Sequence, residues 1–143
     1  MSVVEVVAMT GEPDDRFARG IATAMDLFSG SPTLPRFPVP DEIDADWNGF
    51  SVSTVMGDVW SRPGLDAKHR SMITIALLTA THKPEQLKAY VSIGLNQGLT
   101  RSQICEVILH TSVYAGFPAA IEGFRIASKV FGEYDAAATP DAT

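Results

Sequence analysis

Residues 66–103 read DAKHRSMITIALLTATHKPEQLKAYVSIGLNQGLTRSQ, and this stretch decides the fold class. Asp66 is a typical helix N-cap, and the apolar run that follows predicts a helix to about Thr81, buried on most of its faces. Pro84 opens another helix that stops at Gly98, because proline suits the first turn and glycine the position after the last. The stretch therefore predicts helices joined by short turns.

Helix signals continue on both sides of that stretch. Thr100 and Gln103 form a capping box for a helix that ends at Gly116, and Pro118 begins a last helix that ends at Gly132. Two further helices are expected before residue 66. The first opens near Pro13, places Phe17, Ile21, Met25 and Phe28 at helical spacing, and ends at Gly30. The second covers residues 45–60 with Trp47, Phe50, Thr54 and Gly57 on one face. Six helices without a strand hairpin predict an all-α bundle.

The predicted domain organisation is simple. Residues 1–12 are an N-terminal extension, residues 13–132 a single helical domain, and residues 133–143 a disordered tail. Residues 30–40, GSPTLPRFPVP, carry four prolines and are expected to form an extended connection. Because this connection is apolar, we expect it to pack across the domain surface or against a neighbouring subunit.

Composition and charge narrow the class of protein. The chain has 143 residues and a formal net charge of −6, which disfavours binding to nucleic acid or to an anionic membrane. It contains no apolar run long enough to cross a bilayer, and its N-terminus does not resemble a signal peptide, so a cytoplasmic protein is expected. Cys105 is the single cysteine, which rules out an internal disulfide and a CxxC pair and is better read as a small buried hydrophobe.

Motifs for nucleotide, serine-hydrolase, zinc-protease and calcium chemistry are absent from the sequence. The three histidines, His69, His82 and His110, are too scattered to predict a metal site, so no metal and no cofactor are expected. Glu106 and His110 stand at i and i+4 on one helix face. The carboxylate could orient the imidazole for catalysis, or the two could form a surface ion pair or surround a core histidine, and the sequence favours neither.

Residues 57–66 (GDVWSRPGLD), 70–78 (RSMITIALL) and 108–120 (ILHTSVYAGFPAA) resemble the γ-carboxymuconolactone decarboxylase family. The similarity runs from about Phe50 to Phe131, with a weaker echo over residues 16–30. It implies a six-helix, all-α fold of the carboxymuconolactone decarboxylase and AhpD-like type, with homo-oligomers that are trimers or hexamers. The family holds cofactor-free decarboxylases and AhpD-like proteins of thiol peroxidase systems.

Two positions depart from the family pattern. Decarboxylases of this type carry Glu-Leu-x-x-His at the start of the fourth helix, where this chain has Gln86-Leu-Lys-Ala-Tyr90. In the AhpD-like branch the same helix carries CxxC, whose positions fall on Lys83 and Gln86, so thiol chemistry is excluded. Gln86 and Tyr90 still lie one helical turn apart and can face one cavity.

The resemblance implies a carboxy-lyase acting on a small anionic substrate, a carboxylated lactone or related cyclic acid, with an altered acid/base pair. Decarboxylation requires an anchored carboxylate, hydrogen-bond donors for the developing dienolate oxygen and a proton for the carbanion. We assign the anchor to Arg62 or Arg70, the donors to Gln86 and Tyr90, and the proton to His110 or Tyr90. Trp60 and Tyr114 are candidate substrate-binding aromatics, although aromatic side chains in such positions are more often core or interface residues.

Two other functions remain open from the sequence. A different cofactor-free lyase, isomerase or cyclase on the same scaffold is favoured by the loss of the charged pair, since fold does not determine chemistry. A non-catalytic oligomeric binding protein is the second alternative, and binding of small carboxylic acids without turnover would distinguish it.

Overall fold

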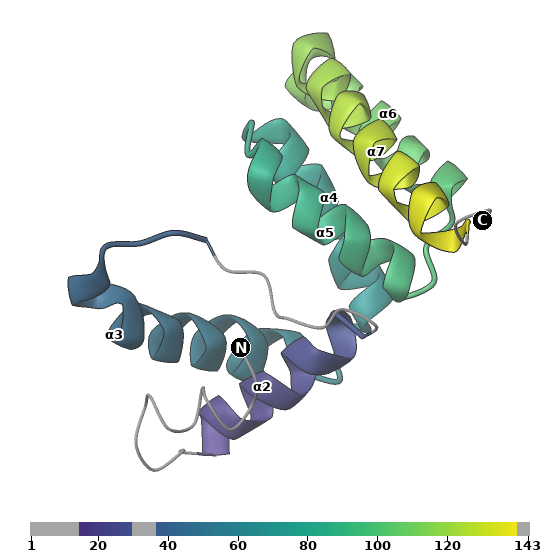
Figure 1. The fold of residues 1–143 in the computed structure, drawn as a ribbon. Coiled ribbons are helices and arrows are strands. Elements are labelled where there is room, and N and C mark those ends of the chain that lie inside the picture. Colours follow the sequence, from purple (N-terminus) through teal and green to yellow (C-terminus); the bar gives the residue numbers. More distant parts are fainter. Residues whose placement is uncertain (1–14, 30–36, 140–143) are drawn as a thin grey trace. The chain divides into compact units, whose positions relative to one another are not determined.

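The computed structural model of the chain describes residues 15–29 and 37–139, and every regular element within them is a helix (Figure 1). The chain divides into two compact units between Asp66 and Ala67. The first unit holds α2 (Asp15–Leu27), α3 (Asp41–Ser51) and the π-helix η1 (Val52–Trp60), and the second holds α4 (Ala67–Ala80), α5 (Pro84–Asn96), α6 (Arg101–Ala115) and α7 (Phe117–Ala138). The predicted all-α class is confirmed.

The first unit is built on close packing between α2 and η1. A Cβ added to Gly57 would lie 2.3 Å from the carbonyl oxygen of Arg16, and one added to Gly20 would lie 2.5 Å from the carbonyl oxygen of Val52. The two helices therefore approach at positions where only glycine fits. Arg16 closes the contact with a 2.6 Å ion pair to Asp58, and its guanidinium lowers the pKa of that carboxyl.

The beginning of the first unit differs from the sequence expectation in two respects. The helix start expected near Pro13, the glycine stop and most of the proline-rich connection lie outside the described residues, which resume at Phe37. Along α2, Phe17 and Ile21 are buried as expected, but Met25 is half exposed, and Ala24 and Leu27 are buried in its place. Phe17 and Ile21 pack against Val52 of η1, and Met25 lies outside this contact.

The helix expected over residues 45–60 is longer and less regular than predicted. It begins at Asp41 as α3 and changes at Val52 into the π-helix η1, in which each turn takes more residues. The extra residue per turn rotates later side chains away from the face set by Trp47 and Phe50. Gly57 is consequently buried against α2, whereas those two aromatic side chains are exposed.

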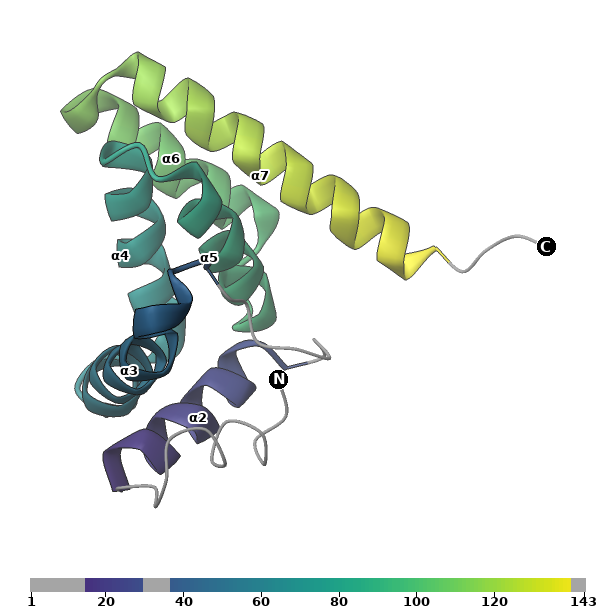
Figure 2. The ribbon, with the colours of Figure 1, turned by 60° about the vertical axis from the view of Figure 1, so that its left-hand side comes forward.

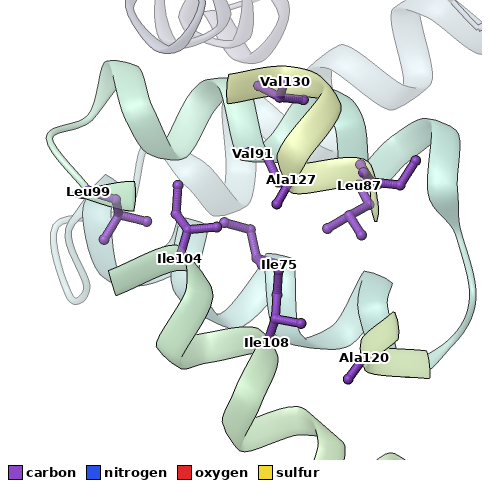
Figure 3. Close-up of a cluster of buried hydrophobic side chains, with 10 residues drawn as sticks. Ile75, Leu87, Val91, Leu99, Ile104, Ile108, Ala120, Ala127 and Val130 are labelled. Atoms are coloured by element: carbon purple, nitrogen blue, oxygen red, sulfur yellow. The ribbon is translucent and has the colours of Figure 1, made fainter. Parts of the chain in front are cut away.

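The second unit is a bundle of two antiparallel helix pairs. α4 packs against α5 and α6 against α7, while α4 also packs against α6 and α5 against α7 (Figures 1 and 2). Their shared core is aliphatic. Figure 3 shows its side chains converging from all four helices and from the turn between α5 and α6: Ile75, Leu87, Val91, Leu99, Ile104, Ile108, Ala120, Ala127 and Val130.

The burial of α4 differs from the prediction made from the sequence. The apolar run in this helix predicted burial on most faces, yet the fully buried residues are Ser71, Ile75 and Thr79, at intervals of four. Ile73 and Leu77, on the opposite side of the helix, are exposed by half or more. Within one copy of the bundle, α4 has neighbours on one side only, so an apolar stripe is left uncovered.

The helix ends in the second unit follow the predicted signals closely. Thr100 and Gln103 form both hydrogen bonds of the capping box, each 3.0 Å long. Gly98 and Gly116 have φ values of 92° and 100°, which L side chains rarely adopt, and they terminate α5 and α6 as expected. Pro84 lies in the first turn of α5.

The last helix extends beyond its predicted end. α7 passes through Gly132 and continues to Ala138, so residues 133–138, expected to be disordered, are helical (Figure 2). Tertiary contacts hold this extension: the Tyr134 hydroxyl donates to Asn96 Oδ1 at 2.6 Å, and Arg101 pairs with Asp135. These partners come from α5 and α6, which is why local sequence pattern did not reveal the extension.

Candidate active site

Gln86 and Tyr90 lie on the first two turns of α5. The proline at position 84 sets the start of this helix, which places the two side chains one turn apart on the same face. Both are partly buried rather than exposed. The arrangement offers a neutral amide and a phenol side by side, and neither group carries charge at neutral pH.

Tyr90 has a less polar environment than a surface tyrosine. Its ring packs against the aliphatic core of the second unit, and this burial raises the pKa of the phenol above its ordinary value. The hydroxyl therefore keeps its proton through the neutral range. Tyr90 can donate a hydrogen bond to an oxyanion, but it is a poor general base.

The raised pKa of the Tyr90 phenol leads to a prediction about how kcat depends on pH. If a reaction depends on the Tyr90 proton, kcat should show no loss attributable to Tyr90 between roughly pH 6 and 9, and should decline only above about pH 10. The measurement is a pH–rate profile of the wild type beside Tyr90→Phe. A rise of kcat with pH across the neutral range that disappears in the variant would indicate a phenolate base and contradict this role.

Three cationic side chains were candidates for binding the substrate carboxylate or for acting on Tyr90, and they differ in burial and in the unit to which they belong. The Lys88 ammonium forms a 3.0 Å ion pair with Glu133 on α7, so its charge serves contacts between helices. Arg70 lies in the first half of α4 and is partly buried. It remains a candidate carboxylate anchor in the second unit. Arg62 is exposed in the turn after η1, and Trp60 is the partly buried last residue of η1, so both belong to the first unit.

His110 and Tyr114 lie on the outer face of α6. Their ring centroids are 5.1 Å apart, both side chains are exposed, and Glu106 is exposed one turn earlier. The core-facing side of α6 is instead formed by Ile104, Ile108 and the residues that follow at helical spacing. Tyr90 and His110 thus occupy different faces of the bundle. Of the predicted residues in the second unit, only Gln86 and Tyr90 share a helix face next to the core.

Three further features of the described residues concern the lone cysteine, groups of metal-ligating side chains and apolar helices. Cys105 in α6 is only partly buried, less than expected of a small buried hydrophobe. Among residues 15–29 and 37–139, no three histidine, cysteine or acidic side chains come together in a group that could hold a metal ion. In the same residues, no helix has both the length and the apolar character needed to span a bilayer.

Comparison with known proteins shows to which family the chain belongs. The profile of the Carboxymuconolactone decarboxylase family matches residues 47–129. A 4-carboxymuconolactone decarboxylase of Acinetobacter baylyi is 30% identical over 118 residues, which cover 82% of this chain and 88% of that protein. The chain belongs to the carboxymuconolactone decarboxylase family.

Two other relatives show how the family varies. A nitrosuccinic acid decarboxylase of Metarhizium robertsii is 36% identical over 77 residues, which are 54% of each chain. An uncharacterized 15.0 kDa protein of Paracoccus denitrificans is 38% identical over 82 residues, 55% of this chain and 60% of that protein. The relatives of this chain therefore include decarboxylases named for two different carboxylic acids. The resemblance to the carboxymuconolactone decarboxylase family is confirmed.

Proposed function

We propose that this family member is a cofactor-free decarboxylase of a small carboxylated lactone or related cyclic acid, with Gln86 and Tyr90 as its hydrogen-bond donors. The observation that carries the proposal is the environment of Tyr90. Burial keeps the phenol protonated one turn from a neutral amide, in a family whose relatives include named decarboxylases. Two fixed neutral donors suit an oxygen that gains negative charge during the reaction.

The proposed reaction breaks the bond between the substrate carbon and its carboxylate, and carbon dioxide leaves. The electron pair of that bond moves onto the conjugated carbonyl oxygen as a dienolate, which accepts hydrogen bonds from Gln86 and Tyr90. Tyr90 then gives its proton to the substrate carbon, which restores the neutral ring system, and the phenolate is reprotonated from solvent. His110, on another face of the bundle, takes no part in this step. Donors held in place before the charge develops lower the barrier because they need no reorganisation.

The substrate is expected to be a carboxylic acid with a group that can accept electrons. The names of the two decarboxylase relatives denote a carboxylated lactone and a nitro dicarboxylic acid. In both compounds an oxygen-bearing group can accept the electrons left by carbon dioxide. We assign the anchoring of the substrate carboxylate to Arg70, the candidate that lies in the same unit as Gln86 and Tyr90, because guanidinium binds carboxylate through two parallel hydrogen bonds.

A direct assay tests the proposal. The purified protein is incubated with γ-carboxymuconolactone, related carboxylated lactones and nitrosuccinate, and released carbon dioxide is measured together with the organic product. Carbon dioxide from at least one compound, at a rate above the protein-free control, is expected. Conversion to a ring isomer of unchanged mass would instead support the isomerase or cyclase alternative, and binding without any turnover would support the non-catalytic one.

Restoring the usual family pair provides a second expected result. The double variant Gln86→Glu with Tyr90→His should decarboxylate γ-carboxymuconolactone faster than the wild type, because it supplies an ionisable acid and base at the same two positions. Initial rates of both proteins on this one substrate measure the effect. Equal or lower activity of the double variant would mean that this pair does not set the difference between the chain and the family pattern.

A further inference from the structure

Lys83 lies in the turn between α4 and α5, and hydrogen bonds fix its backbone on both sides. Its N–H donates to the Leu78 carbonyl oxygen at 3.0 Å, and its carbonyl oxygen accepts from the Leu87 N–H at 2.9 Å. The preceding residue, His82, has a φ of 55° and donates its N–H to the Thr79 carbonyl oxygen at 3.3 Å, which completes a Schellman-type helix end. The end of α4 therefore determines where Lys83 stands on α5.

Lys83 continues the helix face that carries the two proposed donors. It is the N-cap residue of α5, so Lys83, Gln86 and Tyr90 stand at i, i+3 and i+7. Residues at these intervals lie one above another on a helix surface. A substrate that accepts hydrogen bonds from Gln86 and Tyr90 would lie against this face, next to the long and flexible Lys83 side chain.

The position of the Lys83 ammonium is unfavourable for the helix itself. An N-cap is usually a side chain that accepts a hydrogen bond, and a cation is disfavoured there because the N-terminal end of a helix carries partial positive charge. Thr100 accepts such a bond at the start of α6, whereas Lys83 forms none at the start of α5. A residue that breaks a local rule without benefit to the fold is a candidate for a role in function.

No carboxylate pairs with Lys83 in the part of the chain that the structure describes. Glu85 stands two residues further along, an interval at which helical side chains do not face each other. Glu122 on α7 accepts hydrogen bonds from Arg125 at both of its oxygens, at 3.0 and 2.5 Å. Where decarboxylases of this family carry glutamate, one turn from Lys83, this chain has the neutral Gln86. The charge of the ammonium is therefore left for an anionic ligand.

We propose that Lys83 binds a second carboxylate of the substrate, one that keeps its charge throughout the reaction. This inference rests on the proposed decarboxylation at Gln86 and Tyr90, for which one carboxylate is assigned to Arg70. The dienolate oxygen accepts from both donors and lies between them, whereas Lys83 stands one turn beyond Gln86, on the side away from Tyr90. Its ammonium therefore meets the end of the substrate rather than the oxygen that gains charge. Lys83 thus favours dicarboxylic acids over acids with a single carboxylate.

Substitutions at Lys83 test the proposal by separating KM from kcat. Lys83→Met removes the charge and keeps an unbranched side chain, and Lys83→Arg keeps the charge. On the acid that the wild type decarboxylates, Lys83→Met should raise KM about tenfold and leave kcat within about threefold, because this ion pair is equally strong in substrate and transition state. Lys83→Arg should restore most of the affinity. The matched control is Lys129→Met, which removes another exposed lysine of the second unit that has no ion pair among the described residues.

Binding of succinate tests the same contact without turnover. Succinate is a dicarboxylate that lacks a group able to accept electrons, so it can bind without reacting. Calorimetry should show about tenfold weaker binding to Lys83→Met than to the wild type or to Lys129→Met. Unchanged affinity of Lys83→Met, a wild type that does not bind millimolar succinate, or a fall in kcat at constant KM would each overturn the role of Lys83.

The two measurements also distinguish this inference from the proposed function. Carbon dioxide release with a KM that does not depend on Lys83 would reject the inference and leave the proposed decarboxylation intact. Succinate binding that depends on Lys83, in a protein that decarboxylates none of the tested acids, would support the inference and reject the proposed reaction.

Discussion

Tyr90→Phe is expected to lower kcat by about 10²–10³-fold on whichever carboxylic acid the wild type decarboxylates. The variant removes one hydroxyl and leaves the ring, which packs against the aliphatic core, so the helix bundle is retained. Loss of one fixed donor to a developing oxyanion costs on this order in kcat. The effect should fall on kcat more than on KM, because the hydrogen bond strengthens as charge reaches the oxygen.

The matched control for this variant is Tyr134→Phe. Tyr134 also packs against the core, and its hydroxyl donates to Asn96 Oδ1 and to the Ser92 carbonyl oxygen, which are contacts between helices. Its loss should lower stability slightly and leave kcat within about twofold of the wild type. Steady-state kinetics of the three proteins decide the matter. If Tyr90→Phe retained wild-type kcat, the donor role would be wrong.

Gly57→Ala is expected to destabilise the first unit by about 1–3 kcal/mol or more, the range for overpacked contacts. The added methyl group would stand 2.3 Å from the Arg16 carbonyl oxygen, which is part of the α2 backbone and cannot rotate away as a side chain can. Relief requires α2 and η1 to separate, which would also open the ion pair between Arg16 and Asp58. We expect the backbone amides of α2 to be the first to lose protection against hydrogen exchange.

Gly49→Ala is the matched control, since Gly49 is also a helical glycine of this unit but has no atom within 4 Å of an added Cβ. Alanine there should be neutral or stabilising by up to about 1 kcal/mol, because glycine is the poorer helix former. Urea unfolding, combined with hydrogen exchange of the α2 amides, measures both variants. Equal stabilities for the two would show that the close approach at Gly57 is not maintained in solution.

Local chemistry made much of the second unit predictable. The capping box at Thr100 and Gln103, the proline at 84 and the glycines at 98 and 116 act on their own or adjacent turns of the chain, so their effects can be recognised without knowing the fold. The positions of Gln86 and Tyr90 on one helix face follow from the same local geometry. The candidate donor pair was therefore identifiable from sequence.

Other features depend on which elements meet. The environment that raises the pKa of Tyr90 comes from the shared aliphatic core, and the extension of α7 past Gly132 depends on partners in α5 and α6. The conversion of one predicted helix into α3 and η1 accompanies packing at Gly57. These effects come from residues far apart along the chain, whose proximity no local pattern encodes.

Caps, helix breakers and motifs are local and specific, so the helical class, most helix ends in the second unit and the family could be predicted from the amino-acid sequence alone. The tertiary structure decided which apolar faces are covered. Ile73 and Leu77 have the same hydrophobic character as Ile75, yet only Ile75 is buried, because the other helices of the second unit pack against the Ile75 side of α4. An apolar side chain is more stable when it is removed from water, but it becomes buried only where another element packs against it.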